Sequence, residues 1–161
     1  MKLAITDANI FIDLIKINSL PLLFRLEIEL YTTIEVLNEL LDHQKPEVLS
    51  YQTQGMLTID SGISFQSLYK KEINKRLSYA DSSVIYYAHY LKAGILTGDY
   101  SLRKFVEENT EVHGILWLLC RFVEQKLMTE TMAHQSLTLL ISGNHRLPME
   151  ECEKLLKKWE N

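Results

Sequence analysis

Short apolar runs alternate with longer amphipathic stretches along this chain. The runs at residues 3–5, 28–33, 56–60, 94–99 and 112–113 have the length and composition of strands. The stretches between them carry apolar residues at the three- and four-residue spacing of helices that face a core. Strands separated by helices pair in parallel through right-handed crossovers, so the pattern predicts a parallel sheet covered by helices.

Capping residues and prolines indicate where these helices begin. Thr33 and Ser78 have the N-cap side chains, and Pro46 stands at a helix start. The helices are expected at about residues 8–18, 20–27, 34–45, 62–77, 79–92, 101–109, 114–127, 130–142 and 148–159. We predict a three-layer α/β/α domain with four to five parallel strands over residues 1–127. Residues 128–161 are predicted to form a helical extension that packs on this domain or continues it.

Composition narrows the class of protein only slightly. The chain is 47% apolar with a net charge of -4, which argues against attachment to nucleic acid by bulk charge but leaves room for a local basic patch. No run reaches the roughly 20 apolar residues of a membrane span. Cys120 and Cys152 have no metal-ligand spacing. We therefore expect a soluble, cytoplasmic protein without a membrane partner.

Two carboxylates directly follow predicted strands. Asp7 comes after the first strand, and Asp99 ends the fourth in Thr97-Gly98-Asp99. The C-terminal ends of parallel strands border the crevice where ligands gather in such sheets. Each aspartate also precedes a helix, so each is equally well explained as an ordinary N-cap.

Asp81 gives the most informative single position. On its predicted helix it shares a face with Val84, Ile85 and Ala88, which should pack on the sheet. A buried carboxylate without a partner costs several kcal/mol, so an acid there suggests a function. Ser78 and Asp81 also have the spacing of a capping box, and the two interpretations are compatible.

A fourth acid is harder to choose from the pattern. Glu39 lies nearly opposite the centre of the apolar stripe of its helix, which predicts a solvated side chain. Glu35 is its neighbour one turn earlier and competes for any role. Periodicity alone does not select Glu39.

Several carboxylates that meet in one crevice cannot all stay ionised unless a cation neutralises them. Oxygen ligands suit Mg²⁺ or Mn²⁺, and the scattered histidines and cysteines offer no softer set. Phosphodiester hydrolysis is the chemistry that uses such a site.

Four short motifs around these acids resemble those of a known family. The order Thr6-Asp7-Ala8-Asn9, Val36-Leu37-Asn38-Glu39-Leu40, Tyr79-Ala80-Asp81, Leu96-Thr97-Gly98-Asp99 is similar to that of the PIN-domain nucleases, and among them the VapC-type toxins of toxin–antitoxin pairs. The resemblance implies a PIN-like fold and an acidic quartet for catalysis, with Mg²⁺ or Mn²⁺ held by three of its members. It assigns Asp7, Glu39, Asp81 and Asp99 to catalysis, Asp7, Asp81 and Asp99 to the metal, and Asn9 and Thr97 to polar support.

The resemblance also implies an RNA substrate. Basic residues near two of the acids suit contacts to RNA phosphates, although a solvated helix face explains them as well: Lys70, Lys71, Lys75, Arg76 and Arg103. Tyr79 and Tyr100 flank two acids and could stack on bases. The implied partners are an RNA substrate and a small antitoxin protein, and a homodimer is left open.

The sequence is compatible with three functions. The favoured one is a metal-dependent endoribonuclease that acts as the toxin of a toxin–antitoxin pair. The second is a non-catalytic PIN-like module that binds RNA or a protein without cutting. The third is an α/β phosphatase with an aspartate nucleophile, which would want a second aspartate where this chain has Asn9.

Overall fold

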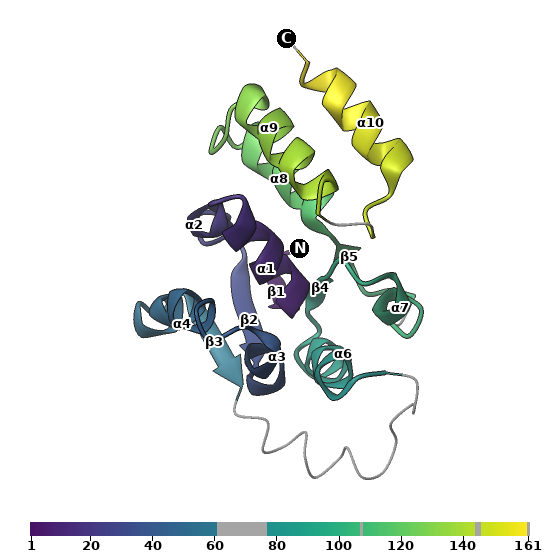
Figure 1. The fold of residues 1–161 in the computed structure, drawn as a ribbon. Helices are drawn as coiled ribbons and strands as arrows, with labels where there is room; N and C mark the ends of the chain where they lie inside the picture. Colours follow the sequence, from purple (N-terminus) through teal and green to yellow (C-terminus); the bar gives the residue numbers. More distant parts are fainter. Residues whose placement is uncertain (61–76, 107, 144–145, 161) are drawn as a thin grey trace.

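A five-stranded parallel sheet forms the centre of the molecule. The computed structural model describes residues 1–60, 77–106, 108–143 and 146–160. The strand order is β3-β2-β1-β4-β5, with every pair parallel (Figure 1). The strands are β1 (Leu3–Thr6), β2 (Glu29–Thr33), β3 (Leu57–Asp60), β4 (Gly94–Leu96) and β5 (Val112–His113). The predicted α/β class is confirmed.

Burial explains why these apolar runs become strands. Ile5 of β1 pairs with Tyr31 of β2 and with Ile95 of β4. Ala4, Ile5, Ile95 and Leu96 are at most 1% exposed. A strand covered on both faces reads as a continuous apolar run rather than an alternating one, which is the pattern of β1 and β4.

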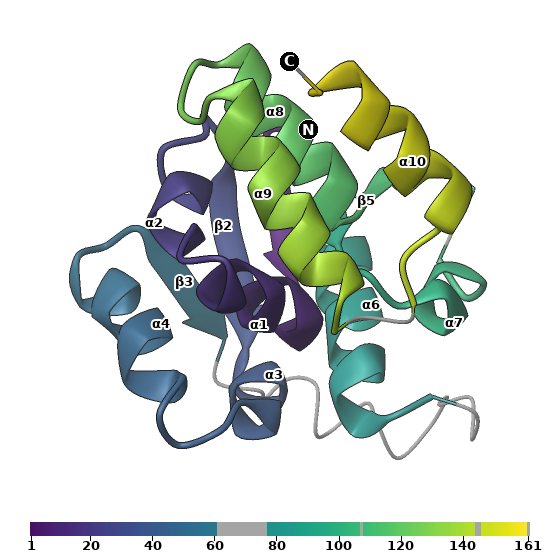
Figure 2. The same cartoon turned by 45° about the horizontal axis from the view of Figure 1, so that its top comes forward.

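Helices cover both faces of the sheet. The described helices are α1 (Ala8–Lys16), α2 (Leu20–Leu23), α3 (Ile34–Glu39), α4 (Lys45–Thr53), α6 (Tyr79–Leu91), α7 (Tyr100–Arg103), α8 (Ile115–Glu124), α9 (Glu130–Ile141) and α10 (Met149–Lys158). The connection from β1 to β2 and the one from β3 to β4 run in opposite directions across the sheet. Right-handed crossovers then place α1 and α6 on opposite faces (Figure 2), as expected for three layers.

Three helix lengths were predicted wrongly. The helix expected over 34–45 ends at Glu39, because Leu40 turns to an extended backbone with ψ 145° while its side chain is buried in the core. The side chain of Gln44 then accepts from Leu41 N at 3.0 Å, and α4 begins at Lys45. Helices α2 and α7 are also shorter than the spans expected at 20–27 and 101–109. The helix expected at 62–77 lies outside the described residues, except for its last position.

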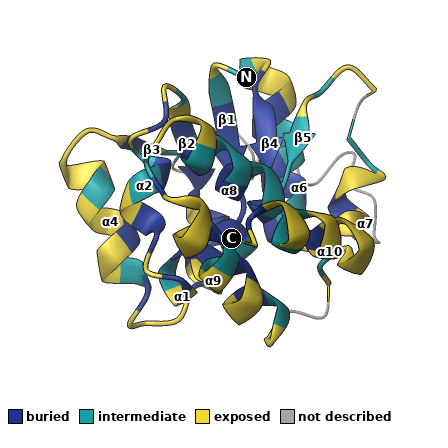
Figure 3. Cartoon of the chain, turned by 90° about the horizontal axis from the view of Figure 1, so that it is seen from above, coloured by how far each residue is buried: buried dark blue, intermediate teal, exposed yellow. Residues whose placement is uncertain are grey.

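The C-terminal helices share the core of the sheet domain. Helix α9 packs on α8, and α10 packs on α9. Leu137 of α9 and Trp159 after α10 are at most 1% exposed and belong to the same apolar cluster as β1 and β4. Figure 3 shows the burial along each element, with β4 in the dark blue of buried residues. Among the described residues, no helix is long and apolar enough to span a membrane.

Candidate active site

Asp7 lies at the C-terminal end of β1 and is 3% exposed. Its Oδ1 accepts from Ala8 N at 2.7 Å, which caps α1. Its Oδ2 accepts from Asn9 Nδ2 at 2.7 Å and from Thr97 Oγ1 at 2.7 Å. The N-cap interpretation is therefore correct, but it accounts for one oxygen only. The second oxygen joins β1 to the end of β4.

Thr97 and Asn9 connect the first acid to the last. Thr97 Oγ1 accepts from Asp99 N at 3.0 Å while it donates to Asp7. Asn9 Oδ1 accepts from Gly98 N at 2.7 Å. The sequence predicted both side chains as polar support, and the structure shows the bonds through which they link Asp7 to the Thr97–Asp99 turn.

Asp99 and Asp81 each cap a helix as well. Asp99 Oδ1 accepts from Ser101 N at 2.6 Å at the start of α7. Asp81 Oδ2 accepts from Ser78 N at 3.2 Å, and Ser78 Oγ accepts from Asp81 N at 3.0 Å, which completes a capping box on α6. In the described part of the chain, the other oxygen of each carboxylate has no hydrogen bond. Each of these two acids therefore keeps one carboxylate oxygen that can bind a ligand.

Electrostatics joins these acids with Glu39. Burial raises the pKa of Asp7, the hydrogen bonds from Thr97 and Ala8 lower it, and the charges of Asp81 and Asp99 raise it further. Loss of hydration to neighbouring protein groups raises the pKa of Glu39, and the charges of Asp7 and Asp81 raise it further, although the residue as a whole is exposed. Asp7 thus lies in the field of Asp81 and Asp99, and Glu39 lies in the field of Asp7 and Asp81.

Glu35 differs from Glu39 although both are on α3. Glu39 is exposed, as the periodicity predicted. Glu35 is 5% exposed, and within the described residues neither of its carboxylate oxygens has a hydrogen-bond partner. Asp7 and Asp81 influence the pKa of Glu39. The electrostatic influence of Asp7 and Asp81 on Glu39 therefore favours Glu39 over Glu35 as the fourth acid.

One contact that holds α3 to α6 was missed from the sequence. Thr33 Oγ1 caps α3 by accepting from Val36 N at 3.1 Å and lies 2.7 Å from Ser83 Oγ of α6. Both hydroxyls are buried. Glu39 ends α3 and Asp81 lies in the first turn of α6, so this bond helps to fix the two acids relative to each other. Two buried hydroxyls 50 residues apart leave no local sequence signal.

The predicted RNA-binding residues have different outcomes. Lys70, Lys71, Lys75 and Arg76 lie outside the described residues. Arg103 is exposed overall, but its Nη2 donates to the carbonyl of Thr97 at 3.1 Å. Tyr79 and Tyr100 are 36% and 72% exposed, and Lys104 Nζ lies 4.9 Å from the centre of the Tyr100 ring.

The residues present suit a hard divalent cation by their chemistry. The donors are carboxylate oxygens, and the two like charges that raise the pKa of Asp7 would be neutralised by such an ion. Across residues 1–60, 77–106, 108–143 and 146–160, however, no three histidine, cysteine or acidic side chains lie at metal-ligand spacing. A cation bound here would need the acids to move closer together.

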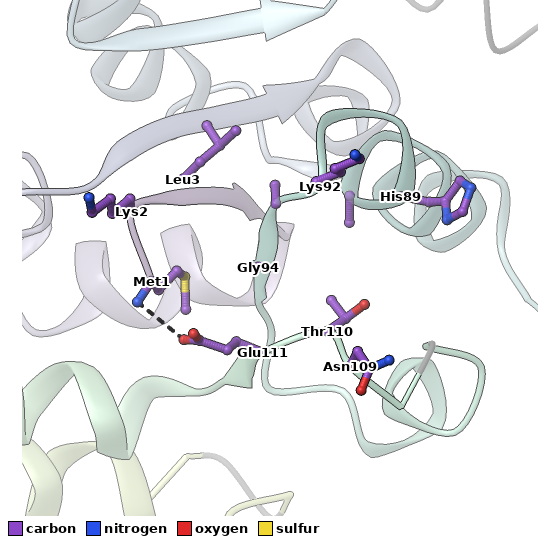
Figure 4. Close-up of a pocket in the computed structure, with 11 residues that line it drawn as sticks. Met1, Lys2, Leu3, His89, Lys92, Gly94, Asn109, Thr110 and Glu111 are labelled. Carbon is purple, nitrogen blue, oxygen red and sulfur yellow. Dashed lines mark ion pairs between the residues drawn. The ribbon is translucent and has the colours of Figure 1, made fainter.

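A separate pocket lies at the opposite, N-terminal edge of the sheet (Figure 4). Its volume is about 480 Å³, and it is lined by the starts of β1 and β4 and the end of α6. The amine of Met1 pairs with Glu111 Oε2 at 3.2 Å. In Figure 4, Lys2 points to one side of the pocket, and Lys92 and His89 lie on the other side. The carboxylate that lines this pocket is therefore already paired, with the Met1 amine.

Fold and site together define an α/β protein with acids gathered at the C-terminal edge of a parallel sheet. The model of a PIN-domain family matches residues 3–161, so the chain belongs to the PIN-domain family. Proteins of this family are generally nucleases that use divalent metals. Comparisons with curated proteins and with solved structures found no match.

Proposed function

We propose that this protein is an endoribonuclease that needs Mg²⁺ or Mn²⁺ and serves as the toxin of a toxin–antitoxin pair. The observation that carries the proposal is buried Asp7, held at a strand end in the field of Asp81 and Asp99. A buried carboxylate surrounded by like charges is unfavourable for stability unless a cation binds, so function is the simplest reason for keeping it.

In this proposal Asp7, Asp81 and Asp99 hold the cation. When bound, the ion would shield the phosphodiester and lower the pKa of water. Glu39 is exposed and has a raised pKa, which suits a group that accepts a proton from the attacking water. Asn9 and Thr97 keep Asp7 oriented. An enzyme of this kind would act in the cytoplasm, where its RNA substrates are.

The test is cleavage of total cellular RNA by purified protein with Mn²⁺, with and without EDTA. Asp7→Asn and Asp81→Asn should abolish cleavage. Asp42→Asn is the matched control, because Asp42 is an exposed acid paired with Lys45 on the chain between α3 and α4. Cleavage that persists in both site variants, or in EDTA, would refute the carboxylate mechanism.

The toxin role has its own test. Expression in a bacterial host should arrest growth, and Asp7→Asn should relieve the arrest. The toxin role also predicts a small antitoxin encoded beside this chain, whose co-expression should suppress the arrest. Arrest by the Asp7→Asn variant at equal protein level would contradict a catalytic toxin.

A non-catalytic binding module is the second candidate. One observation favours it, namely that no three acids in the described part of the chain reach metal-ligand spacing. This alternative predicts that the folded protein binds RNA or a protein partner, cuts no RNA with either ion, and gains no thermal stability from Mn²⁺.

A further inference from the structure

Arg103 reaches back from the end of α7 to the strand end that carries the site. Its Nη2 donates to the Thr97 carbonyl at 3.1 Å. Helix α7 begins directly after Asp99, so the guanidinium closes the short loop that contains this acid. Its charge is also close enough to His113 to contribute to lowering the pKa of that imidazole, after burial.

Gly114 makes room for this guanidinium. A Cβ built on Gly114 would lie 3.0 Å from Arg103 Nη2 and 3.3 Å from the Thr97 carbonyl oxygen. The backbone of Gly114, at φ -119° and ψ -170°, is extended and open to any residue. Space beside Arg103, rather than backbone freedom, is therefore what the glycine provides.

The bond from Arg103 fixes one peptide unit together with Asn9. The Thr97 carbonyl and the Gly98 N–H belong to the same planar Thr97–Gly98 peptide. Arg103 holds its oxygen, and Asn9 Oδ1 accepts from its N–H at 2.7 Å. Rotation of this plane would turn the chain on both sides of it.

Both acids at this edge depend on that plane. Buried Thr97 donates from Oγ1 to Asp7 Oδ2 at 2.7 Å and accepts from Asp99 N at 3.0 Å. Its own N–H donates to the His113 carbonyl at 2.8 Å. A tilt of the Thr97–Gly98 peptide would therefore shift the carboxylates of Asp7 and Asp99 relative to each other.

We propose that Arg103 is a positioning residue that, seated over Gly114, holds the Thr97–Gly98 peptide and thereby sets the relative placement of Asp7 and Asp99. The sequence had suggested a phosphate contact for this side chain instead. The inference rests on the proposed function only in calling the acids cation ligands, since the placement itself can be measured without metal.

Three variants separate positioning from phosphate binding. Arg103→Met removes the bond. Gly114→Ala keeps the positive charge of Arg103 but places a Cβ about 3.0 Å from its Nη2, so that the guanidinium must shift from its present position. Lys104→Met is the matched control, because it removes the neighbouring exposed cation of the same segment and leaves the Thr97 carbonyl bonded.

The first measurement is amide hydrogen exchange at Gly98 and Asp99 in the metal-free protein. Arg103→Met and Gly114→Ala should both speed it roughly three- to tenfold, as expected for the loss of one supporting hydrogen bond, and Lys104→Met should not. Unchanged exchange in both variants would overturn the proposal, whether or not the protein binds metal.

The second measurement is a Mn²⁺ titration by calorimetry, beside RNA affinity measured in EDTA. Arg103→Met and Gly114→Ala should each weaken Mn²⁺ binding about tenfold, at the low end for a lost supporting contact. RNA affinity of Gly114→Ala should equal that of the wild type. If Arg103→Met lowers only a salt-dependent RNA affinity, Arg103 is a phosphate contact and the proposal is wrong. If the wild type binds no Mn²⁺, the proposed function fails, and the exchange measurement still decides the role of Arg103.

Discussion

The two edges of the sheet differ in how their charged groups are paired. At the N-terminal edge, the Met1 amine pairs with Glu111, and His113 Nε2 lies 3.5 Å from the same carboxylate. At the C-terminal edge, buried Asp7 lies in the field of Asp81 and Asp99, and within the described residues the hydrogen bonds to these three acids come from neutral groups. The pKa of Glu111 is lowered, chiefly by the amine, whereas the pKa of Asp7 is raised, chiefly by burial.

This difference separates a structural arrangement from a functional one. Opposite charges at the surface neutralise each other without a bound ligand. Like charges beside a buried carboxylate disfavour ionisation, and a cation is the ligand that relieves them. Both edges belong to the same five strands, so the contrast comes from which side chains the strand ends carry.

The largest expected effect is on catalysis at the C-terminal edge. Asp7→Asn should lower the rate of RNA cleavage by roughly 100- to 1,000-fold or more, because several kcal/mol of charge stabilisation would be lost with the cation. Single-turnover cleavage at saturating Mn²⁺ measures this. Glu111→Gln changes an acid of the N-terminal edge and should cut RNA at the wild-type rate. A large loss of cleavage in this variant would contradict a purely structural role for the N-terminal edge.

The second effect is stabilisation by the cation. Mn²⁺ at about 100 times its Kd should stabilise the fold by about 2.7 kcal/mol, which is roughly 5–10 °C in Tm for a domain of this size. Differential scanning fluorimetry should show the shift in the wild type and in Glu111→Gln, and should show none in Asp7→Asn. A wild-type Tm that ignores Mn²⁺ would mean that the acidic edge holds no cation.

A third prediction uses the two glutamates of α3. Glu35→Leu should stabilise the protein by roughly 1–3 kcal/mol, because it replaces a buried carboxylate that has no hydrogen-bond partner within the described residues. Chemical denaturation measures the gain. Cleavage should survive Glu35→Leu and be lost in Glu39→Gln. The opposite result would make Glu35 the fourth acid.

The smallest effect is a difference in the sign of pH dependence between the edges. The folded pKa of Asp7 lies above its ordinary value of 3.8, so its contribution to stability is fully present below that pH and is lost as pH rises through the folded pKa. The folded pKa of Glu111 lies below its ordinary value of 4.5, so its contribution is present above that pH and is lost as pH falls through the folded pKa.

Tm profiles in EDTA can show this. Relative to the wild type, Asp7→Asn should gain stability as pH rises above about 3.8. Glu111→Gln should instead lose stability relative to the wild type as pH rises toward 4.5. Parallel profiles for the two variants would contradict opposite roles for the two edges.

Local patterns were enough to predict much of this fold and part of its site. Apolar runs located all five strands, and strand–helix alternation implied parallel pairing. Asp7 and Asp99 were identified because they follow strands. Helix ends were predicted less well, since Leu40 leaves α3 to bury its side chain in a core that the local sequence does not describe.

The sequence by itself determined the identity and chain order of the acids, the caps that begin α1, α6 and α7, and the parallel sheet that brings strand ends to one edge. These depend on contacts between near neighbours or on the chirality of the chain. Only the tertiary structure decided that Glu39 lies in the field of Asp7 and Asp81, and that the oxygens of Glu35 are buried without a hydrogen-bond partner among the described residues. It likewise decided that Arg103 turns to the Thr97 carbonyl. The position of Glu39 depends on side chains far apart in sequence that meet only when helices pack, as Thr33 and Ser83 do between α3 and α6. The Arg103 bond spans only six residues, but the space it occupies depends on Gly114 at the start of α8.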